Sequence, residues 1–253
     1  LSFLIEDGGR KILFDTGYSD VFIRNAGTMV VGLQDLDYIV ISHGHNDHTW
    51  GLRYLCELYK HLDSGRRPTL LCHPLALLKK EDEEGEDIGN VIPPEMLSEC
   101  FNIEYSAKPR WITDTLVFLG EIERGFGFES PNPIGTIHIA GAKREDLLQD
   151  DTALAYKSPD GLVIITGCSH SGICNIVESA RKICGDMRVV DIIGGFHLLN
   201  PGGEKLEGIV SYMKKLNPQV LHPCHCTDLH SKAALLAALN VSEVGVGLQF
   251  SYH

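Results

Sequence analysis

Short apolar runs separated by polar turns recur through the first half of the chain. Residues 1–6 and 11–14 are strand-like, and Asp7-Gly8-Gly9 between them is typical of a hairpin turn, because glycine tolerates a positive φ. Further apolar runs predict strands at 37–42, 69–72 and 116–119. After the first of these, apolar side chains at helical spacing predict a helix that packs on a sheet: Leu52, Leu55, Cys56, Tyr59 and Leu62.

The second half repeats one unit three times: a strand, a polar turn and a helix. The strands are predicted at 162–166, 189–193 and 220–221, with a further strand at 152–156 before them. The helices that follow the three turns are predicted over 173–184, 206–213 and 231–239. Alternating strands and helices of this kind form a sheet covered by helices, so the chain is predicted to have an α/β fold.

Residues 66–145 interrupt this regularity. Prolines punctuate the segment, and only a short helix at 75–80 and the strands at 69–72 and 116–119 stand out. We treat it as a candidate insertion, which would act as a lid or a substrate-recognition element, or would be structural or disordered. The length predicts one domain over residues 1–253, and the strand-like start at Leu1 predicts a further strand upstream.

Composition limits the classes of partner. The net charge is −12, and six of the seven residues from Glu81 to Asp87 are acidic, as in a solvated loop, so a nucleic-acid partner is not expected. No apolar run reaches the length of about 20 residues that a membrane-spanning helix needs, and no signal peptide is recognisable. The eight cysteines are spread through a chain rich in apolar residues. A cytoplasmic, reducing location without a disulfide framework is therefore predicted.

The densest chemistry follows the strand at 37–42. His43, His45, Asp47 and His48 lie directly beyond it, and Gly44 would let the backbone turn sharply there. Two imidazoles two residues apart can face one cation, while an aspartate and a histidine further round the turn can reach a second. The spacing therefore predicts a site for two metal ions.

Three other histidines follow predicted strands. His170 ends the turn after 162–166, His197 the turn after 189–193, and His225 lies beyond 220–221. Ligands bind beyond the carboxyl ends of strands in open α/β sheets, so we expect these histidines and His43 to meet at one rim.

The motif HGHNDH at 43–48 matches the H-x-H-x-D-H signature of the metallo-β-lactamase fold superfamily. The run Lys11 to Gly17 resembles that superfamily's strand ending in D-T-G, and GCSH, GGFH and HCT follow in the expected order. These motifs most resemble the branch of 7,8-dihydropterin-6-methyl-4-(β-D-ribofuranosyl)aminobenzene-5'-phosphate synthase-like proteins. The resemblance implies an αββα sandwich with an inserted segment, and metal-dependent hydrolase activity.

The resemblance also implies a ligand set. It would comprise six residues: His43, His45, Asp47, His48, His170 and His225. In the superfamily the D-T-G aspartate, here Asp15, braces the metal loop by hydrogen bonding.

Some of these assignments leave alternatives. Relatives usually carry a bridging aspartate where this chain has Cys168-Ser169-His170, and we favour His170 over Cys168 as the donor. Asp150 and Asp151 could supply the missing carboxylate, although we read them as polar strand-end residues. His222 competes with His225, which we prefer because the HCT motif begins there.

The function predicted from these residues is hydrolysis, or a synthase-like reaction, by a metal-bound hydroxide on a small anionic, phosphorylated, pterin-like substrate. Asp47 would bind metal and orient the nucleophile, and His197 would donate a proton or hydrogen bond to the leaving group. The cofactor would be one or two divalent transition metals, with zinc preferred and iron or manganese as alternatives. A non-catalytic metal-binding or ligand-sensing protein, and an iron-dependent redox enzyme, are the competing hypotheses. The oligomeric state does not follow from the sequence.

Overall fold

The computed structural model describes residues 1–62, 65–129 and 132–252. The chain folds into two compact units. Unit 1 comprises Leu1–Ala107 and Pro133–Asp150, and unit 2 comprises Lys108–Asn132 and Asp151–His253. No helix in the described ranges has the length and apolar character needed to cross a membrane.

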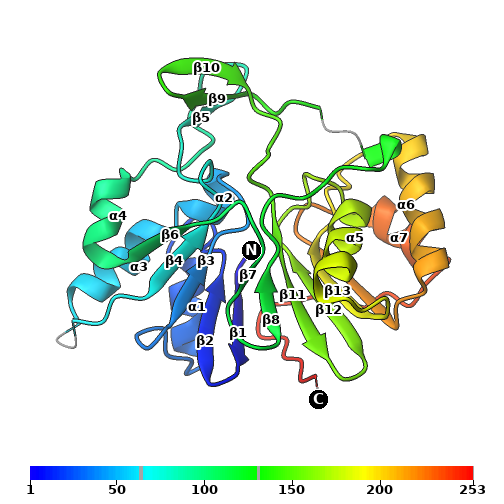
Figure 1. Cartoon of the computed structure of the whole chain (residues 1–253), viewed down its shortest axis with the longest axis horizontal. Coiled ribbons are helices and arrows are strands. Elements are labelled where there is room, and N and C mark those ends of the chain that lie inside the picture. The colour runs from blue at the N-terminus through cyan, green and yellow to red at the C-terminus, as the bar shows by residue number, and fades with distance from the viewer. Residues whose placement is uncertain (63–64, 130–131, 253) are drawn as a thin grey trace. The chain divides into compact units, whose positions relative to one another are not determined.

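Unit 1 contains a five-stranded sheet in the order β1-β2-β3-β4-β6 (Figure 1). β1 and β2 form the predicted antiparallel hairpin, and the remaining neighbours are parallel. The strands are β1 (Phe3–Asp7), β2 (Arg10–Phe14), β3 (Tyr38–Val40), β4 (Thr69–Cys72) and β6 (Asn102–Tyr105). β2 and β3 run in the same direction, so the turns after them lie at the same edge of the sheet.

Helices cover this sheet with apolar side chains. α3 (Leu52–Lys60) is the helix predicted from the apolar repeat, and it buries Leu52, Leu55, Cys56 and Tyr59. The other helices of unit 1 are α1 (Val21–Thr28), the short α2 (Asn46–Thr49) and α4 (Pro94–Cys100). The sequence pattern had not indicated α1 or α4, which bury only one and two residues respectively and so carry little periodic signal.

Unit 1 also contains a small sheet in the order β10-β9-β5. It consists of β5 (Lys80–Glu81), β9 (Thr136–Ile139) and β10 (Ala142–Glu145). The predicted helix at 75–80 is wrong: these residues form turns, and Lys80 enters the sheet opposite Ile137. A six-residue helix has little stability of its own, so pairing with a neighbouring strand satisfies the backbone hydrogen bonds of Lys80 instead. Residues 66–145 thus contribute strands to each of the three sheets formed by the described residues.

Unit 2 contains a six-stranded sheet in the order β14-β13-β12-β11-β8-β7. The parallel core strands are β12 (Gly161–Thr166), β13 (Val189–Gly195) and β14 (Val220–Cys224). They are joined by α5 (Ile173–Cys184) and α6 (Gly203–Leu216), which confirms the predicted βαβ repeat. The unit is completed by β7 (Arg110–Trp111), β8 (Leu116–Phe118), β11 (Ala153–Ser158), α7 (Leu229–Leu236) and the 3₁₀ helix η1 (Gly127–Glu129).

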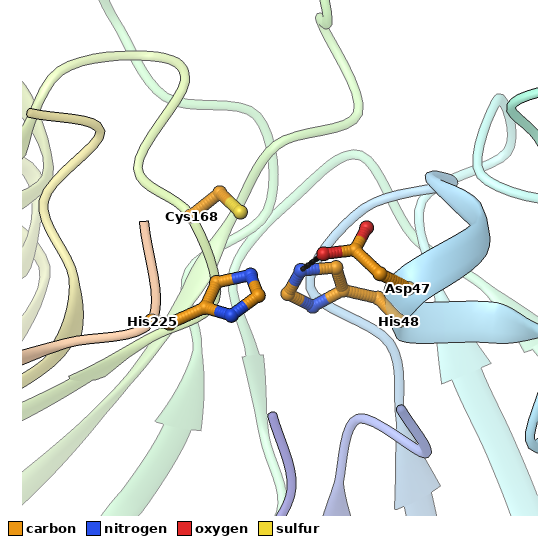
Figure 2. A group of neighbouring side chains, drawn as sticks. All are labelled: Asp47, His48, Cys168 and His225. Carbon is orange, nitrogen blue, oxygen red and sulfur yellow. Dashed lines mark ion pairs between the residues drawn. The ribbon is translucent and has the colours of Figure 1, made fainter. Parts of the chain in front are cut away.

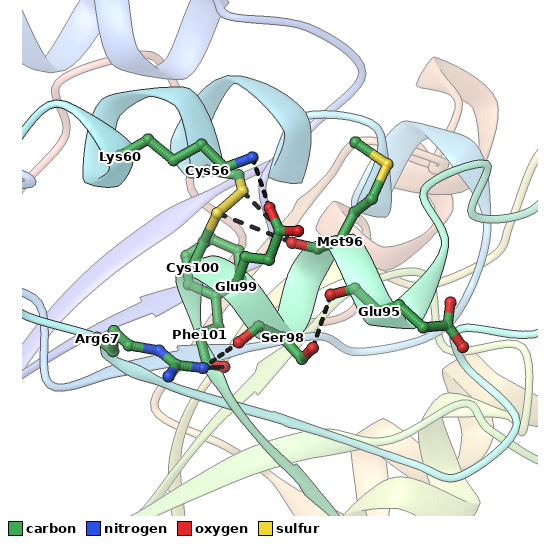
Figure 3. Close-up of a disulfide and its surroundings, with 9 residues drawn as sticks. All are labelled: Cys56, Lys60, Arg67, Glu95, Met96, Ser98, Glu99, Cys100 and Phe101. Carbon is green, nitrogen blue, oxygen red and sulfur yellow. Dashed lines mark hydrogen bonds and ion pairs between the residues drawn. A yellow bond between two sulfur atoms is a disulfide. The ribbon is translucent and has the colours of Figure 1, made fainter.

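A disulfide joins Cys56 of α3 to Cys100 of α4 (Figure 3). An ion pair between Lys60 and Glu99, 2.9 Å apart, links the same two helices. The expectation that the chain has no disulfide is therefore wrong for this pair, while the other six cysteines form no disulfide. The sequence could not show the pairing, because the two residues are 44 positions apart and meet only when the helices pack.

Replacing both Cys56 and Cys100 with serine is expected to lower the free energy of unfolding by about 2 to 4 kcal/mol, since the bond restricts a long loop in the unfolded chain. Urea unfolding of the oxidised proteins measures the difference. Dithiothreitol should destabilise the wild type similarly and leave the double variant unchanged. Equal stability of the two oxidised proteins would contradict a structural role for the bond.

Candidate metal centre

Two turns at the carboxyl edge of the unit 1 sheet carry the predicted metal loop and its brace. Asp15 follows β2, and residues 43–48 follow β3. The amide of Asp15 donates to the carbonyl of Val40 at 2.8 Å, which fixes the two turns against each other. Asp15 has a φ of 60°, a left-handed conformation that is unfavourable for a non-glycine residue. Such strain is found where a side chain must be held in a particular place.

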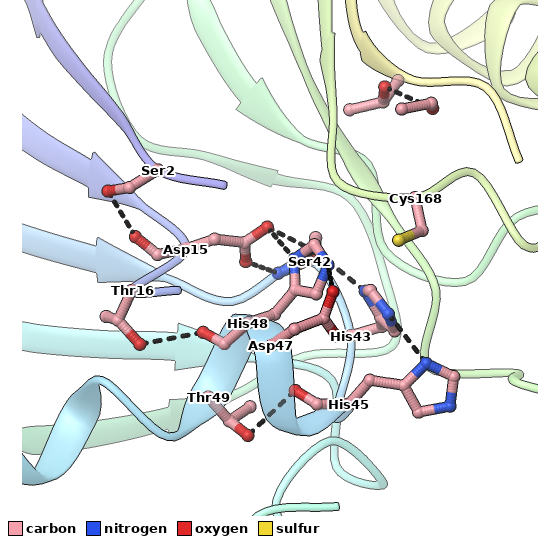
Figure 4. Close-up of polar contacts among 12 residues, drawn as sticks. Ser2, Asp15, Thr16, Ser42, His43, His45, Asp47, His48, Thr49 and Cys168 are labelled. Atoms are coloured by element: carbon pink, nitrogen blue, oxygen red, sulfur yellow. Dashed lines mark hydrogen bonds and ion pairs between the residues drawn. The ribbon is translucent and has the colours of Figure 1, made fainter. Parts of the chain in front are cut away.

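Asp15 is wholly buried and holds the metal loop through three hydrogen bonds (Figure 4). Its Oδ1 accepts from the amide of Ser42 at 2.8 Å, and its Oδ2 accepts from the Ser42 hydroxyl at 2.7 Å. The Nδ1 atom of His48 lies 2.6 Å from the same Oδ2. These contacts are those of the bracing role that the resemblance implied, and they leave the Nε2 atom of His48 facing away from Asp15.

The four loop residues form two donor pairs. The Nε2 atom of His43 lies 3.2 Å from Nδ1 of His45, and Nε2 of His48 lies 3.4 Å from Oδ2 of Asp47 (Figure 2). Two ligand atoms about 2.1 Å from one tetrahedral cation are roughly 3.4 Å apart. Each pair therefore has a spacing that suits two ligands of one divalent metal, and the residues of the loop fit the ions that the motif predicts.

The two pairs differ in protonation. Burial lowers the pKa of His45 to about 4, and the charge of Lys80 adds to this effect, so His45 is neutral near pH 7. Burial alone would also lower the pKa of His48, but the charges and hydrogen bonds of Asp15 and, to a lesser extent, Asp47 outweigh it and raise the pKa to about 9. In the metal-free protein His48 is therefore a cation, and a metal that binds to it must displace a proton.

The metal-free protein is expected to lose stability as the pH rises from about 6.5 to about 9. The pKa of His48 is higher in the folded state than its ordinary value of 6.5, so its contribution is complete below that pH and disappears as the folded group deprotonates. Unfolding by urea in the presence of a chelator, at about pH 6 and about pH 9.5, measures the loss. The variant His48→Gln should lack this component, and an unchanged pH dependence in it would contradict the assignment.

Gly44 separates the two imidazoles of the first donor pair. Its φ is not positive, so the turn does not require glycine for its backbone conformation. A Cβ atom there would instead lie 2.4 Å from the carbonyl oxygen of Ala76 and 2.8 Å from Cε of Lys80. Glycine is needed at position 44 because Ala76 and Lys80 approach the loop closely. The reason expected from the sequence, a sharp backbone turn, was different.

In unit 2 the predicted histidines follow parallel strands that end at one edge of the sheet. His170 follows β12, His197 follows β13 and His225 follows β14. Each of these turns contains a non-glycine residue in the left-handed region: Ser169 with a φ of 64°, His197 with 51° and His225 with 54°. Left-handed backbone thus recurs at these three strand ends of unit 2.

Side chains from these turns lie close together within unit 2. The rings of His170 and His197 have centroids 4.3 Å apart. Cys168 and His225 offer donor atoms within 4.8 Å of each other, and both residues are drawn in Figure 2. The structure therefore leaves both the imidazole of His170 and the thiol of Cys168 as donors from the turn that lacks the usual aspartate.

Cys226 is a thiol beside the turn of Cys168 that was not among the residues singled out from the sequence. Its side chain is buried, and its Sγ atom lies 3.4 Å from the carbonyl oxygen of Cys168. The Cys168 side chain is the largest influence on the Cys226 thiol, and together with His197 it lowers the pKa to about 4 against the effect of burial. Its place inside the HCT motif was the only signal in the sequence.

His222 belongs to a different network. Its Nδ1 atom lies 2.8 Å from Oδ1 of Asp191, whose Oδ2 accepts a hydrogen bond from the hydroxyl of Tyr252 at 2.6 Å. The ring of His222 also packs against Phe250, with centroids 4.5 Å apart. Among the described residues, His222 therefore contacts Asp191 and Phe250 and is not part of the group of donor atoms that contains Cys168 and His225.

A protein-family model described as the Metallo-beta-lactamase superfamily matches residues 1–244. The chain therefore belongs to the metallo-β-lactamase superfamily, whose members are mostly metal-dependent hydrolases and generally bind divalent metals. This confirms the family indicated by the motifs and the α/β class of its fold.

Two proteins of Methanocaldococcus jannaschii are similar in sequence. One is named 7,8-dihydropterin-6-methyl-4-(beta-D-ribofuranosyl)-aminobenzene-5'-phosphate synthase and is 30% identical over 92% of this chain and 82% of its own length. The other, the uncharacterised protein MJ0448, is 32% identical over 92% of this chain and 86% of its own length. Among solved structures, Tm1679, described as a metal-dependent hydrolase of the beta-lactamase superfamily, is 28% identical with a TM-score of 0.82, covering 96% of this chain and 89% of its own.

Proposed function

We propose that this protein is a metal-dependent enzyme that acts on a small phosphorylated, pterin-like substrate. The observation that carries the proposal is the pair of donor sets in the metal loop, His43 with His45 and Asp47 with His48, at spacings suited to divalent metals. The substrate class comes from the relative named as a dihydropterin phosphate synthase. Because that relative is named a synthase whereas the superfamily consists mostly of hydrolases, the proposed reaction is either a hydrolysis or a synthase-like reaction at the same metal site.

The ligand set of the proposal is that implied by the family motifs. The ligands would be six residues: His43, His45, Asp47, His48, His170 and His225. The bound cations, with zinc preferred over iron and manganese, would lower the pKa of a coordinated water to about 7 and accept charge from a substrate oxygen. This assignment follows the order of the motifs along the chain.

The side chains of the protein would perform three tasks. Asp15 holds His48 by a hydrogen bond to Nδ1, which keeps Nε2 directed toward Asp47. Asp47 would orient the nucleophile as well as bind metal. His197 would donate a proton or a hydrogen bond to the leaving group.

The charge of the chain favours a compact anion over a polymer. A net charge of −12 repels nucleic acid, whereas a few cations in a cleft can locally attract one or two phosphate groups.

The absence of the usual bridging aspartate after β12 supports a second candidate, a metal-binding protein without turnover.

The proposal is tested by measuring turnover with purified protein loaded with Zn²⁺, Mn²⁺ or Fe²⁺. The substrates are phosphomonoesters, cyclic phosphodiesters, pterin phosphates, thioesters and β-lactams. Turnover is expected for at least one of the phosphorylated compounds, with a pterin phosphate preferred. Activity confined to thioesters or β-lactams would overturn the substrate class. Stoichiometric metal without turnover of any compound would favour the non-catalytic alternative.

A further inference from the structure

Two consecutive aspartates, Asp150 and Asp151, stand at the boundary between the two compact units, one in each. Both are 1% exposed, which is rare for aspartate unless the carboxylate is fully engaged. Each contacts a backbone amide in a turn that carries candidate metal ligands of its own unit.

Asp150 contacts the metal loop of unit 1. Its Oδ2 accepts a hydrogen bond from the amide of Gly44 at 2.7 Å, between His43 and His45. Its Oδ1 accepts from the ammonium group of Lys80 at 2.8 Å. The two oxygens therefore have different tasks, because one holds the loop and the other is held by Lys80.

Lys80 gives this arrangement its rigidity. It is wholly buried, an unusual position for lysine, and its ammonium group also pairs with Asp146 at 2.7 Å. A Cβ atom at Gly44 would lie 2.8 Å from Cε of Lys80, so the aliphatic part of the lysine packs against the loop. Hydrogen bonding and packing by the Lys80 and Asp150 pair thus fix the peptide that joins the two imidazoles.

Asp151 contacts the turn that carries His170 in unit 2. Its Oδ2 accepts hydrogen bonds from both the amide and the hydroxyl of Ser171. The carbonyl of Ser171 accepts from Nδ2 of Asn175 at 2.8 Å. Ser171 is buried and directly follows His170, so its peptide is held on both sides before α5 begins.

We propose that Asp150 and Asp151 are paired positioning residues for the metal ligands. Asp150 orients His43 and His45 through the amide of Gly44, and Asp151 orients His170 through Ser171. They act through the backbone of the ligand turns and not as the missing bridging carboxylate. Asp150 acts within unit 1 and Asp151 within unit 2. The inference rests on the proposed metal site.

Titration of metal-free protein with Co²⁺ tests the pair, since visible absorption reports both affinity and ligand geometry. In Asp150→Asn the new side-chain amide offers one acceptor oxygen to two donors, the backbone N–H of Gly44 and the ammonium group of Lys80. In Asp151→Ala the carboxylate that accepts hydrogen bonds from Ser171 is removed. Each variant is expected to bind Co²⁺ about 10- to 100-fold more weakly, with shifted absorption bands, as when groups that orient metal ligands are lost.

Two controls match these variants. Asp146→Asn alters the same buried ion cluster, but the Oδ1 atom of Asp146 accepts from the amide of Leu148 and not from the metal loop. Thr152→Ala truncates the next buried residue, whose hydroxyl has no hydrogen-bond partner among the described residues. Both controls should keep the wild-type spectrum and bind within about threefold of the wild type.

The outcomes separate this inference from the function on which it rests. A wild type that does not bind Co²⁺ overturns both. A wild type that binds, with either test variant unchanged in spectrum and within about threefold in affinity, overturns the pairing alone. Circular dichroism checks folding. If Asp150→Asn does not fold, Asp150→Glu replaces it under the same criteria, because it keeps the charge beside Lys80 and displaces the acceptor from Gly44.

Discussion

Replacing His45 with alanine is expected to lower kcat/KM for a phosphorylated substrate by about a thousandfold or more, which corresponds to about 4 kcal/mol of transition-state stabilisation. His45 is neutral near pH 7, because burial lowers its pKa to about 4, so its ring is ready to bind metal without losing a proton. Its Nδ1 lies 3.2 Å from Nε2 of His43. Removing one member of this pair leaves a single imidazole and weakens the centre that would activate water.

Steady-state kinetics on the best substrate, with metal in excess, measure this effect. His61→Ala is the matched control, since His61 is an exposed residue at the end of α3. It should retain wild-type kcat/KM. Undiminished activity in His45→Ala would show that the metal loop is not the catalytic centre.

Replacing Asp15 with alanine is expected to lower the free energy of unfolding of the metal-free protein by about 3 to 5 kcal/mol at neutral pH. The change removes the buried carboxylate at Nδ1 of His48 and leaves the buried ring with the partly exposed carboxylate of Asp47, 3.4 Å from Nε2, as a counter-charge. The amide and hydroxyl of Ser42 lose the same acceptor. Breaking one partner of a buried ion pair costs more than the pair contributes, because the remaining group stays desolvated.

Urea unfolding with a chelator present measures the cost. Asp20→Ala is the control, since Asp20 forms an ion pair with Arg24 at 3.3 Å in which both side chains are largely exposed. Pairs of this kind contribute less than about 1 kcal/mol, so the control should be close to the wild type. A loss for Asp15→Ala no greater than for Asp20→Ala would contradict the bracing role.

The sequence predicted those parts of the fold that depend on local pattern. The hairpin of β1 and β2, the strand before His43 and the βαβ repeats leading to His170, His197 and His225 all have strong apolar periodicity. The metal loop was visible because its four candidate ligands lie within residues 43–48 and directly follow a predicted strand.

Contacts between residues that lie far apart in the sequence were not predictable. Gly44 and Asp150 are 106 residues apart, and Lys80 adjoins an acidic run that is typical of a solvated loop. Only the folded chain shows that Lys80 is buried between Asp146 and Asp150. The disulfide between Cys56 and Cys100 also depends on the packing of α3 against α4. The sequence of α4 had no clear apolar periodicity.

The metal content of protein purified without chelator tests the central claim most directly. Elemental analysis is expected to find about one to two transition-metal ions per chain in the wild type. His43→Ala and His48→Ala should each hold less, and His61→Ala should match the wild type. A wild type without a stoichiometric transition metal, or full metal retention in both His43→Ala and His48→Ala, would contradict the account.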